Sequence, residues 1–149
     1  MKAMRRMALV LATLVLCLSM LTSCGSLVED VTVKATDSVL DSIQAEFEAK
    51  GYEVDRADEY SLQRLNEDAP EMFGEDFQGK ITDSLNCDYE EDGMRLSVEM
   101  IALTNPADAA LVEDYLNKWG AEFEEREGYV YEVTNMGWIV GVTYGRPIN

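Results

Sequence analysis

Apolar residues recur at helical spacing in two separate stretches of the chain. In residues 37–50 they return every three or four positions, and Gly51 then offers a left-handed helix stop. Residues 105–120 begin with Asn105-Pro106, a favourable helix start, and carry a broader apolar stripe. The two stripes consist of Val39, Leu40, Ile43 and Phe47, and of Ala107, Leu111, Tyr115 and Trp119. The spacing predicts two amphipathic helices, the second ending at Gly120 before a charged connection over residues 122–127.

Strict alternation of apolar and polar positions predicts strands between and after these helices. Residues 80–89 and 94–102 alternate on either side of Glu90-Glu91-Asp92-Gly93, and an Asp-Gly pair suits a tight hairpin turn. Residues 129–134 and 138–144 form a second alternating pair. A short strand is expected near residues 51–54. On the first strand, we expect one face to carry Ile81, Leu85, Cys87 and Tyr89.

This order of elements predicts an α+β fold. Adjacent hairpins imply an antiparallel sheet of four or five strands, whose apolar side the two amphipathic helices would cover in a two-layer arrangement. A short additional helix is expected over residues 58–67. The order of the strands does not follow from the sequence.

The longest stretch without a periodic pattern is residues 66–79. It combines Pro70, Gly74 and Gly79 with three large apolar residues, Met72, Phe73 and Phe77. Since binding residues are often found on loops, these three residues are the candidate contact with a partner. The alternative is that the phenylalanines fold back and cap the core.

The N-terminus has the features of an export signal. Lys2, Arg5 and Arg6 precede an apolar run over residues 7–21, which is 15 residues long. A helix needs about 20 residues to cross the hydrocarbon core, so this run is short for a membrane span and suits a signal peptide. The run ends in Leu21-Thr22-Ser23-Cys24, with small residues directly before a cysteine.

That ending resembles the lipobox of bacterial lipoproteins. The resemblance implies that a diacylglyceryl group is attached to Cys24 and that cleavage leaves this cysteine as the first mature residue. The alternative is an ordinary signal peptide, or an uncleaved anchor, with a cysteine nearby. The chain would then comprise a signal peptide (1–23), a tether (24–36) and one globular domain (37–149). It would be held on the extracytoplasmic side of the cell membrane by its lipid.

The mature part also resembles small lipoproteins of unknown function. In these proteins a first helix leads into Gly-Tyr-x-Val, here Gly51-Tyr52-Glu53-Val54, ahead of paired hairpins. The resemblance implies no site residues.

Charge narrows the range of partners. The whole chain has a formal net charge of −17, and the three basic residues of the signal peptide do not contribute to the mature domain. Such an acidic surface repels phosphate backbones, so nucleic acid is excluded as an expected partner. Membrane attachment would have to come from acyl chains, because electrostatics oppose it.

The residue inventory also argues against an enzyme. The chain contains no histidine, which removes the commonest general base and most zinc sites. Cys17 would leave with the signal peptide and Cys24 would carry the lipid, so Cys87 is the remaining free thiol, and we expect it to be buried and inert. Acid pairs such as Glu71 with Asp76, and the acidic turn over residues 90–92, are expected to be solvated rather than catalytic or calcium-binding. No cofactor and no metal are therefore expected.

Aromatic residues gather late in the chain. They are Tyr115, Trp119, Tyr129, Tyr131, Trp138 and Tyr144. Aromatic clusters can bind sugars or peptides, but on a sheet beneath helices they are expected to form core.

We therefore predict a non-enzymatic binding domain that contacts an unknown envelope protein or ligand. The alternative is a lipoprotein that binds a small ligand or a cation, and the third hypothesis is a carboxylate-dependent hydrolase.

Overall fold

A computed structural model describes residues 29–148 of the chain, with side chains from residue 39 onward. The elements in chain order are α2 (Glu29–Ala49), β1 (Val54–Arg56), α3 (Glu59–Phe73), β2 (Ile81–Glu91), β3 (Met94–Leu103), the 3-10 helix η1 (Pro106–Asp108), α4 (Ala109–Glu127), β4 (Val130–Asn135) and β5 (Ile139–Pro147). The strands form an antiparallel sheet in the order β1-β2-β3-β5-β4. The predicted α+β fold with its two hairpins is confirmed.

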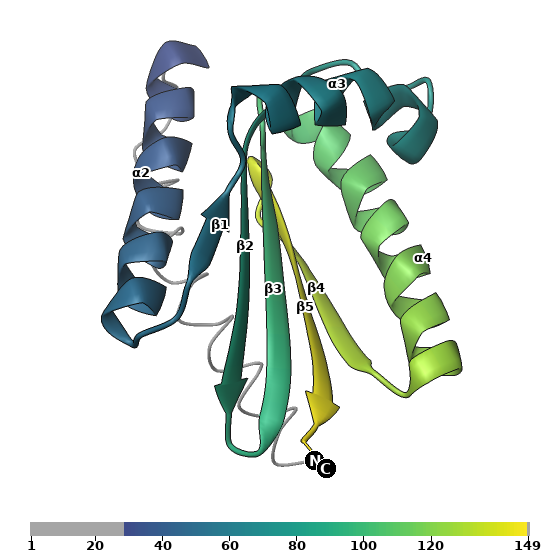
Figure 1. Ribbon diagram of the computed structural model, residues 1–149. Helices are drawn as coiled ribbons and strands as arrows, with labels where there is room; N and C mark the ends of the chain where they lie inside the picture. The colour runs from purple at the N-terminus through teal and green to yellow at the C-terminus, as the bar shows by residue number, and fades with distance from the viewer. Residues whose placement is uncertain (1–28, 149) are drawn as a thin grey trace.

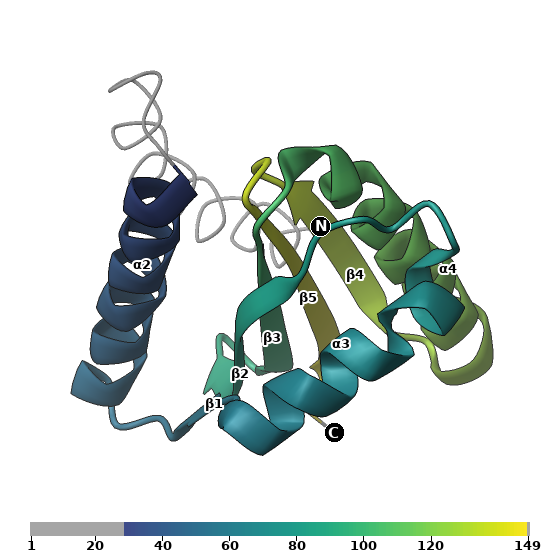
Figure 2. The same ribbon diagram turned by 90° about the horizontal axis from the view of Figure 1, so that it is seen from above.

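The helices lie on both faces of the sheet, whereas the sequence analysis expected two layers. Figure 1 shows α2 along one face, with α3 and α4 on the other, and the view from above in Figure 2 separates the three layers. On the α2 side, Leu40, Ile43 and Phe47 pack over apolar residues of β2 and β3. On the opposite side, α3 and α4 cover Ile101 and Leu103 of β3, among others. The prediction failed here because the central strands are apolar on both faces near their ends, so each face needs a cover.

A β-bulge moves one predicted residue to the opposite face. Ile81 pairs with Leu103, but Asp83 pairs with the adjacent Ala102, so Thr82 is the extra residue. Ile81 therefore packs with the α3 and α4 cluster, while Leu85, Cys87 and Tyr89 face α2. Ile81 was expected on the same face as Leu85. A bulge shifts the alternation by one residue, and the apolar pattern alone does not reveal it.

The turn of the first hairpin is as predicted. Asp92 and Gly93 both have positive φ, 52° and 76°, as a two-residue hairpin turn requires. Cys87, predicted to be a buried thiol, is 1% exposed on β2 and faces α2.

Two helices are longer than predicted, and their extra residues were expected to be tether or loop. The backbone is helical from Glu29, so the last part of the predicted tether, residues 29–36, belongs to α2. Helix α3 continues to Phe73, although residues 66–79 were expected to be irregular. Pro70 lies inside α3, and the helix tolerates it because Ala69 and Phe73 on either side are buried in the core.

Helix α4 runs through Gly120, where the prediction ended it. A Cβ atom on Gly120 would lie 2.2 Å from Cδ2 of Tyr131, so this glycine allows α4 to approach β4 closely. The helix instead ends at Glu127, and Gly128, with a left-handed φ of 70°, follows as its cap. The predicted connection over residues 122–127 is therefore the last part of α4.

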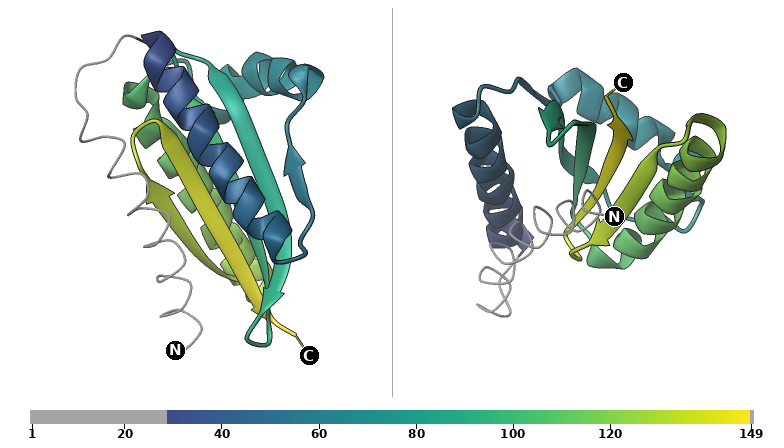
Figure 3. Two further views of the ribbon diagram at one scale, coloured as in Figure 1. Left: turned by 90° about the vertical axis from the view of Figure 1, so that its left-hand side faces the viewer. Right: turned by 90° about the horizontal axis from the view of Figure 1, so that it is seen from below.

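Figure 3 shows α2 running obliquely across the strands, on the side of the sheet away from α4.

No helix within the described residues is long and apolar enough to cross a membrane.

Candidate ligand-binding cavity

Four of the six aromatic residues predicted to be core, Tyr115, Trp119, Tyr129 and Tyr144, form a half-buried wall between α4 and the sheet. Trp119 is 39% exposed, and Tyr115, Tyr129 and Tyr144 are only partly buried. Their rings are linked through Phe123, whose ring centroid lies 5.9 Å from that of Trp119 and 5.6 Å from that of Tyr144. The expectation of core residues holds in part, since Tyr115 and Tyr144 pack against the core cluster, whereas Trp119 is exposed. Because α4 leans over only the β5 and β4 side, the rings stay open to solvent at one edge.

This wall encloses a cavity of about 390 Å³. Its walls come from rings of α4, of β5 and of Tyr129 just before β4, and from Leu65 and Met72 of α3. Ser97, Glu99 and Ile101 of β3 form the floor on the sheet. The lining residues come from α3, α4 and the strands beneath them, and Figure 1 shows α3 and α4 on the same side of the sheet. A cavity of this size, mostly apolar with a few polar groups, is typical of small-molecule sites.

Glu99 is the acidic residue of this cavity. It pairs with Val142 of β5, which places its side chain on the same sheet face as Val142 and so beneath α4. Among the described residues, Glu99 has no hydrogen bond and no ion pair. Burial raises the pKa of its carboxyl above the ordinary value of 4.5. The nearby Tyr144 hydroxyl is affected similarly, since burial, followed by the charge of Glu99, raises the pKa of Tyr144 to about 12.

Other buried acids in the described part of the chain differ from Glu99 because they have partners. Asp108 is 2% exposed, and its carboxylate accepts hydrogen bonds from the backbone N–H of Gln78 at 3.0 Å and of Gly79 at 2.7 Å. Gly79 has no room for a side chain there, since a Cβ would lie 2.8 Å from Asp108 Oδ2. This contact is structural, as it holds the strand entry against the start of α4.

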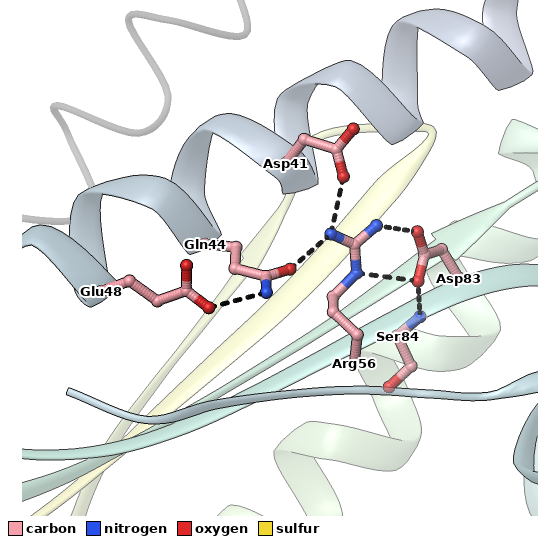
Figure 4. Close-up of polar contacts among 6 residues, drawn as sticks. All are labelled: Asp41, Gln44, Glu48, Arg56, Asp83 and Ser84. Carbon is pink, nitrogen blue, oxygen red and sulfur yellow. Dashed lines mark hydrogen bonds and ion pairs between the residues drawn. The ribbon is translucent and has the colours of Figure 1, made fainter.

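The most connected polar cluster is also structural. Figure 4 shows Arg56 of β1 bridging α2 and β2. Its Nε donates to Asp83 Oδ1 at 3.1 Å and its Nη2 donates to Asp83 Oδ2, while Nη1 donates to Asp41 at 2.9 Å and to Gln44 at 3.0 Å. These hydrogen bonds, above all the one with Asp83, stabilise the positively charged form of Arg56 and so raise its pKa. Because Arg56 and the buried Asp83 are satisfied within the fold, the cluster attaches α2 to the sheet and has no vacant ligand position.

An acidic groove adjoins the cavity on the outer side of α3 and α4. It has a volume of about 710 Å³ and shares Met72, Tyr115 and Trp119 with the cavity. Its charged residues are Asp68, Glu71, Asp114, Glu122 and Lys118. Four acids against one base make the approach to the cavity negative.

The predicted partner contacts are divided between surface and core. Met72 is half-buried and lies in the walls of both the cavity and the groove. Phe73 is 6% exposed and packs against Tyr115, with ring centroids 5.1 Å apart. Phe77 is half-buried against Phe73 at 5.3 Å. Of the three, Met72 is the residue that the structure brings to the cavity.

The remaining predicted sites are not brought together. Glu71 and Asp76 belong to α3 and to the loop after it, and both are exposed. No group of three or more acid or cysteine residues in the described part of the chain is arranged to hold a metal ion. The predicted lipidation site, Cys24, and the lipobox around it lie outside the described residues.

Sequence reasoning missed Glu99. It occupies a polar position of an alternating strand, and such positions are normally solvated. Glu99 lies next to the aromatic second hairpin because β3 pairs with β5. The sequence could have indicated this only if the strand order had been known.

No family model, no curated protein and no solved structure matches this chain.

Proposed function

We propose that this chain is a lipid-anchored binding protein on the extracytoplasmic side of the cell membrane, that it has no catalytic activity, and that it binds its ligand in the cavity between α3, α4 and the sheet. The observation that carries the proposal is the convergence of five aromatic rings, none fully buried, and one unpartnered carboxyl group on a cavity of about 390 Å³. Structural cores close such rings away from solvent, whereas binding sites leave them accessible.

The binding role is favoured over the carboxylate-dependent hydrolase by the composition of the cavity. Glycoside hydrolases, a large class of such enzymes, use two carboxyl groups on either side of the bond that is cleaved. Glu99 is the one carboxyl group among the described residues of the cavity wall. The chain has no histidine to replace the second group.

The two binding hypotheses from the sequence differ in the size of ligand. A cavity of this volume suits a small molecule, or one side chain of an envelope protein, better than a broad protein interface. The structure therefore favours the small-ligand hypothesis. An envelope protein that inserts a side chain beside Met72 is the second candidate.

The membrane anchor is supported by the lipobox-like sequence at Leu21–Cys24 and by the short apolar run before it. Metabolic labelling with a radioactive fatty acid tests it. We expect the wild-type chain to be labelled and processed, and the Cys24→Ala variant to remain an unlabelled precursor. Normal acylation and cleavage of the variant would refute the anchor.

Site-specific photocrosslinking in the native envelope tests the binding site. A photoreactive phenylalanine analogue would replace Trp119 in the cavity wall or, as the control, Tyr60, which is 67% exposed on α3 and is absent from the cavity lining. We expect a reproducible adduct, identified by mass spectrometry, from position 119 alone. We also expect Tyr144→Ala to abolish it. Equal adducts from both positions, or none from position 119, would contradict the assignment.

A further inference from the structure

Glu99 in the cavity differs from the buried acids Asp83 and Asp108 in the partners of its carboxyl group. Within the described residues, buried Asp83 forms an ion pair with Arg56, and buried Asp108 accepts hydrogen bonds from two backbone N–H groups. Glu99 has neither kind of partner, although it forms part of the cavity floor. No buried side-chain oxygen among the described residues lacks a hydrogen-bond partner, so the unpaired Glu99 oxygens are open to the water of the cavity. They are therefore accessible to a ligand, and a positive group on that ligand would pair with them away from bulk water.

The aromatic wall favours the same charge. The faces of Tyr and Trp rings are negative and attract ammonium and guanidinium groups. The protein already shows this interaction at the edge of the wall, where the guanidinium carbon of Arg146 lies 5.4 Å from the centre of the Tyr129 ring. A second cation deeper in the cavity would meet rings of the same kind, with Glu99 below them.

The surroundings select an organic cation over a metal ion. Calcium takes six to eight oxygen ligands, and Glu99 is the one carboxylate among the described residues that line the cavity. Apolar groups such as Leu65, Ile101 and the rings would instead remove apolar surface of a ligand from water. The groove next to the cavity is acidic, so it repels anions and attracts cations toward the entrance.

From these observations we infer that the cavity binds a small organic monocation: an ammonium or guanidinium group on an apolar, preferably aromatic, body. The positive group pairs with Glu99, and the apolar body lies against Trp119 and Tyr144. This inference rests on the proposed function, because it names the class of ligand for the same cavity.

Three probes of similar shape and different charge test the inference. They are phenethylamine, which is an ammonium ion at neutral pH, phenethyl alcohol, which is neutral, and hydrocinnamate, which is an anion. The full-length chain in non-ionic detergent is titrated with each probe by isothermal titration calorimetry, and titrations into detergent alone provide the blank. We expect phenethylamine to bind at least about tenfold more tightly than phenethyl alcohol, and hydrocinnamate to bind least tightly.

Two variants with the same change in net charge separate the local charge from the overall charge. Glu99→Gln removes the carboxylate from the cavity, and Glu46→Gln removes an exposed one from α2 on the opposite face of the sheet. We expect Glu99→Gln to eliminate the tenfold preference while phenethyl alcohol binds as before. Glu46→Gln should retain the preference.

Equal binding of the amine and the alcohol, or a preference that survives in Glu99→Gln, would overturn the inference and leave the cavity as a binding site. Failure of all three probes to bind would also overturn it. The proposed function would then be judged separately by the adduct at position 119, which does not depend on the charge of the ligand.

Discussion

Replacing Gly120 by alanine is expected to destabilise the protein, although alanine is the better helix former. In an unstrained helix interior, replacing glycine by alanine raises the free energy of unfolding by about 1 kcal/mol. Here the new methyl group would lie 2.2 Å from Cδ2, 2.5 Å from Cε2 and 2.5 Å from Cγ of Tyr131. These atoms include the base of the ring, which cannot move without shifting β4.

The magnitude follows from these two opposing effects. Inserting a methyl group into a packed site costs about 1–3 kcal/mol, and contacts this short belong at the upper end. After subtracting the helix-propensity gain, we expect a net loss of about 2 kcal/mol in the free energy of unfolding. For a domain of this size, that lowers the melting temperature by roughly 6–10 °C.

Urea unfolding followed by circular dichroism measures the effect in two backgrounds. In the Tyr131→Ala background the obstruction is gone, so Gly120→Ala should become stabilising by about 1 kcal/mol. Ala121→Gly, at the exposed neighbouring position of α4, measures the propensity effect by itself. If Gly120→Ala stabilised the wild-type protein as much as the Tyr131→Ala variant, the close approach of α4 to β4 could not be the reason for this glycine.

Three further predictions concern charges and the buried thiol. Arg56→Ala should lower the free energy of unfolding by about 2–3 kcal/mol, because it leaves the buried Asp83 carboxylate without its counter-charge and with one backbone hydrogen bond, from Ser84. Arg95→Ala, which breaks an exposed ion pair, should cost at most about 1 kcal/mol, and similar losses in urea unfolding would contradict this. Because the pKa of Glu99 is raised, the folded state binds a proton on this carboxyl group more tightly than the unfolded state does. Protonation of Glu99 therefore stabilises the fold below pH 4.5, and this stabilisation is lost as the pH rises through the folded-state pKa. Glu99→Gln should therefore be more stable than wild type at neutral pH and not at low pH, and a pH series of melting temperatures that shows a constant difference would refute this. The pKa of Cys87 is raised by burial and by the charge of Asp88, so iodoacetamide should modify Cys87 only after unfolding, and rapid alkylation of the folded protein in peptide mapping would disagree.

Local signals in the sequence determined most of the elements. The first hairpin was predictable because Asp92-Gly93 tolerates positive φ at both turn positions and the flanking strands alternate. Burial of Cys87 followed from the same alternation. The helix boundaries were less predictable, because Pro70 and Gly120 have low helix propensity and yet tertiary packing keeps both within helices.

The candidate site could not be predicted, because it depends on contacts between elements distant in sequence. Alternation indicates that Glu99 and Met100 point to opposite faces of β3, but it does not indicate which helix covers each face. The strand order places β5 beside β3, and α4 then covers the face that carries Glu99.

By itself, the sequence determined the α+β class, the hairpins, the acidic charge and the absence of histidine chemistry, since these follow from composition and local periodicity. Only the tertiary structure decided that helices cover both faces of the sheet and that a carboxyl group and several aromatic rings share one cavity. The physical reason is that burial depends on which surfaces pack together, and a strand's sequence is compatible with cover on either face.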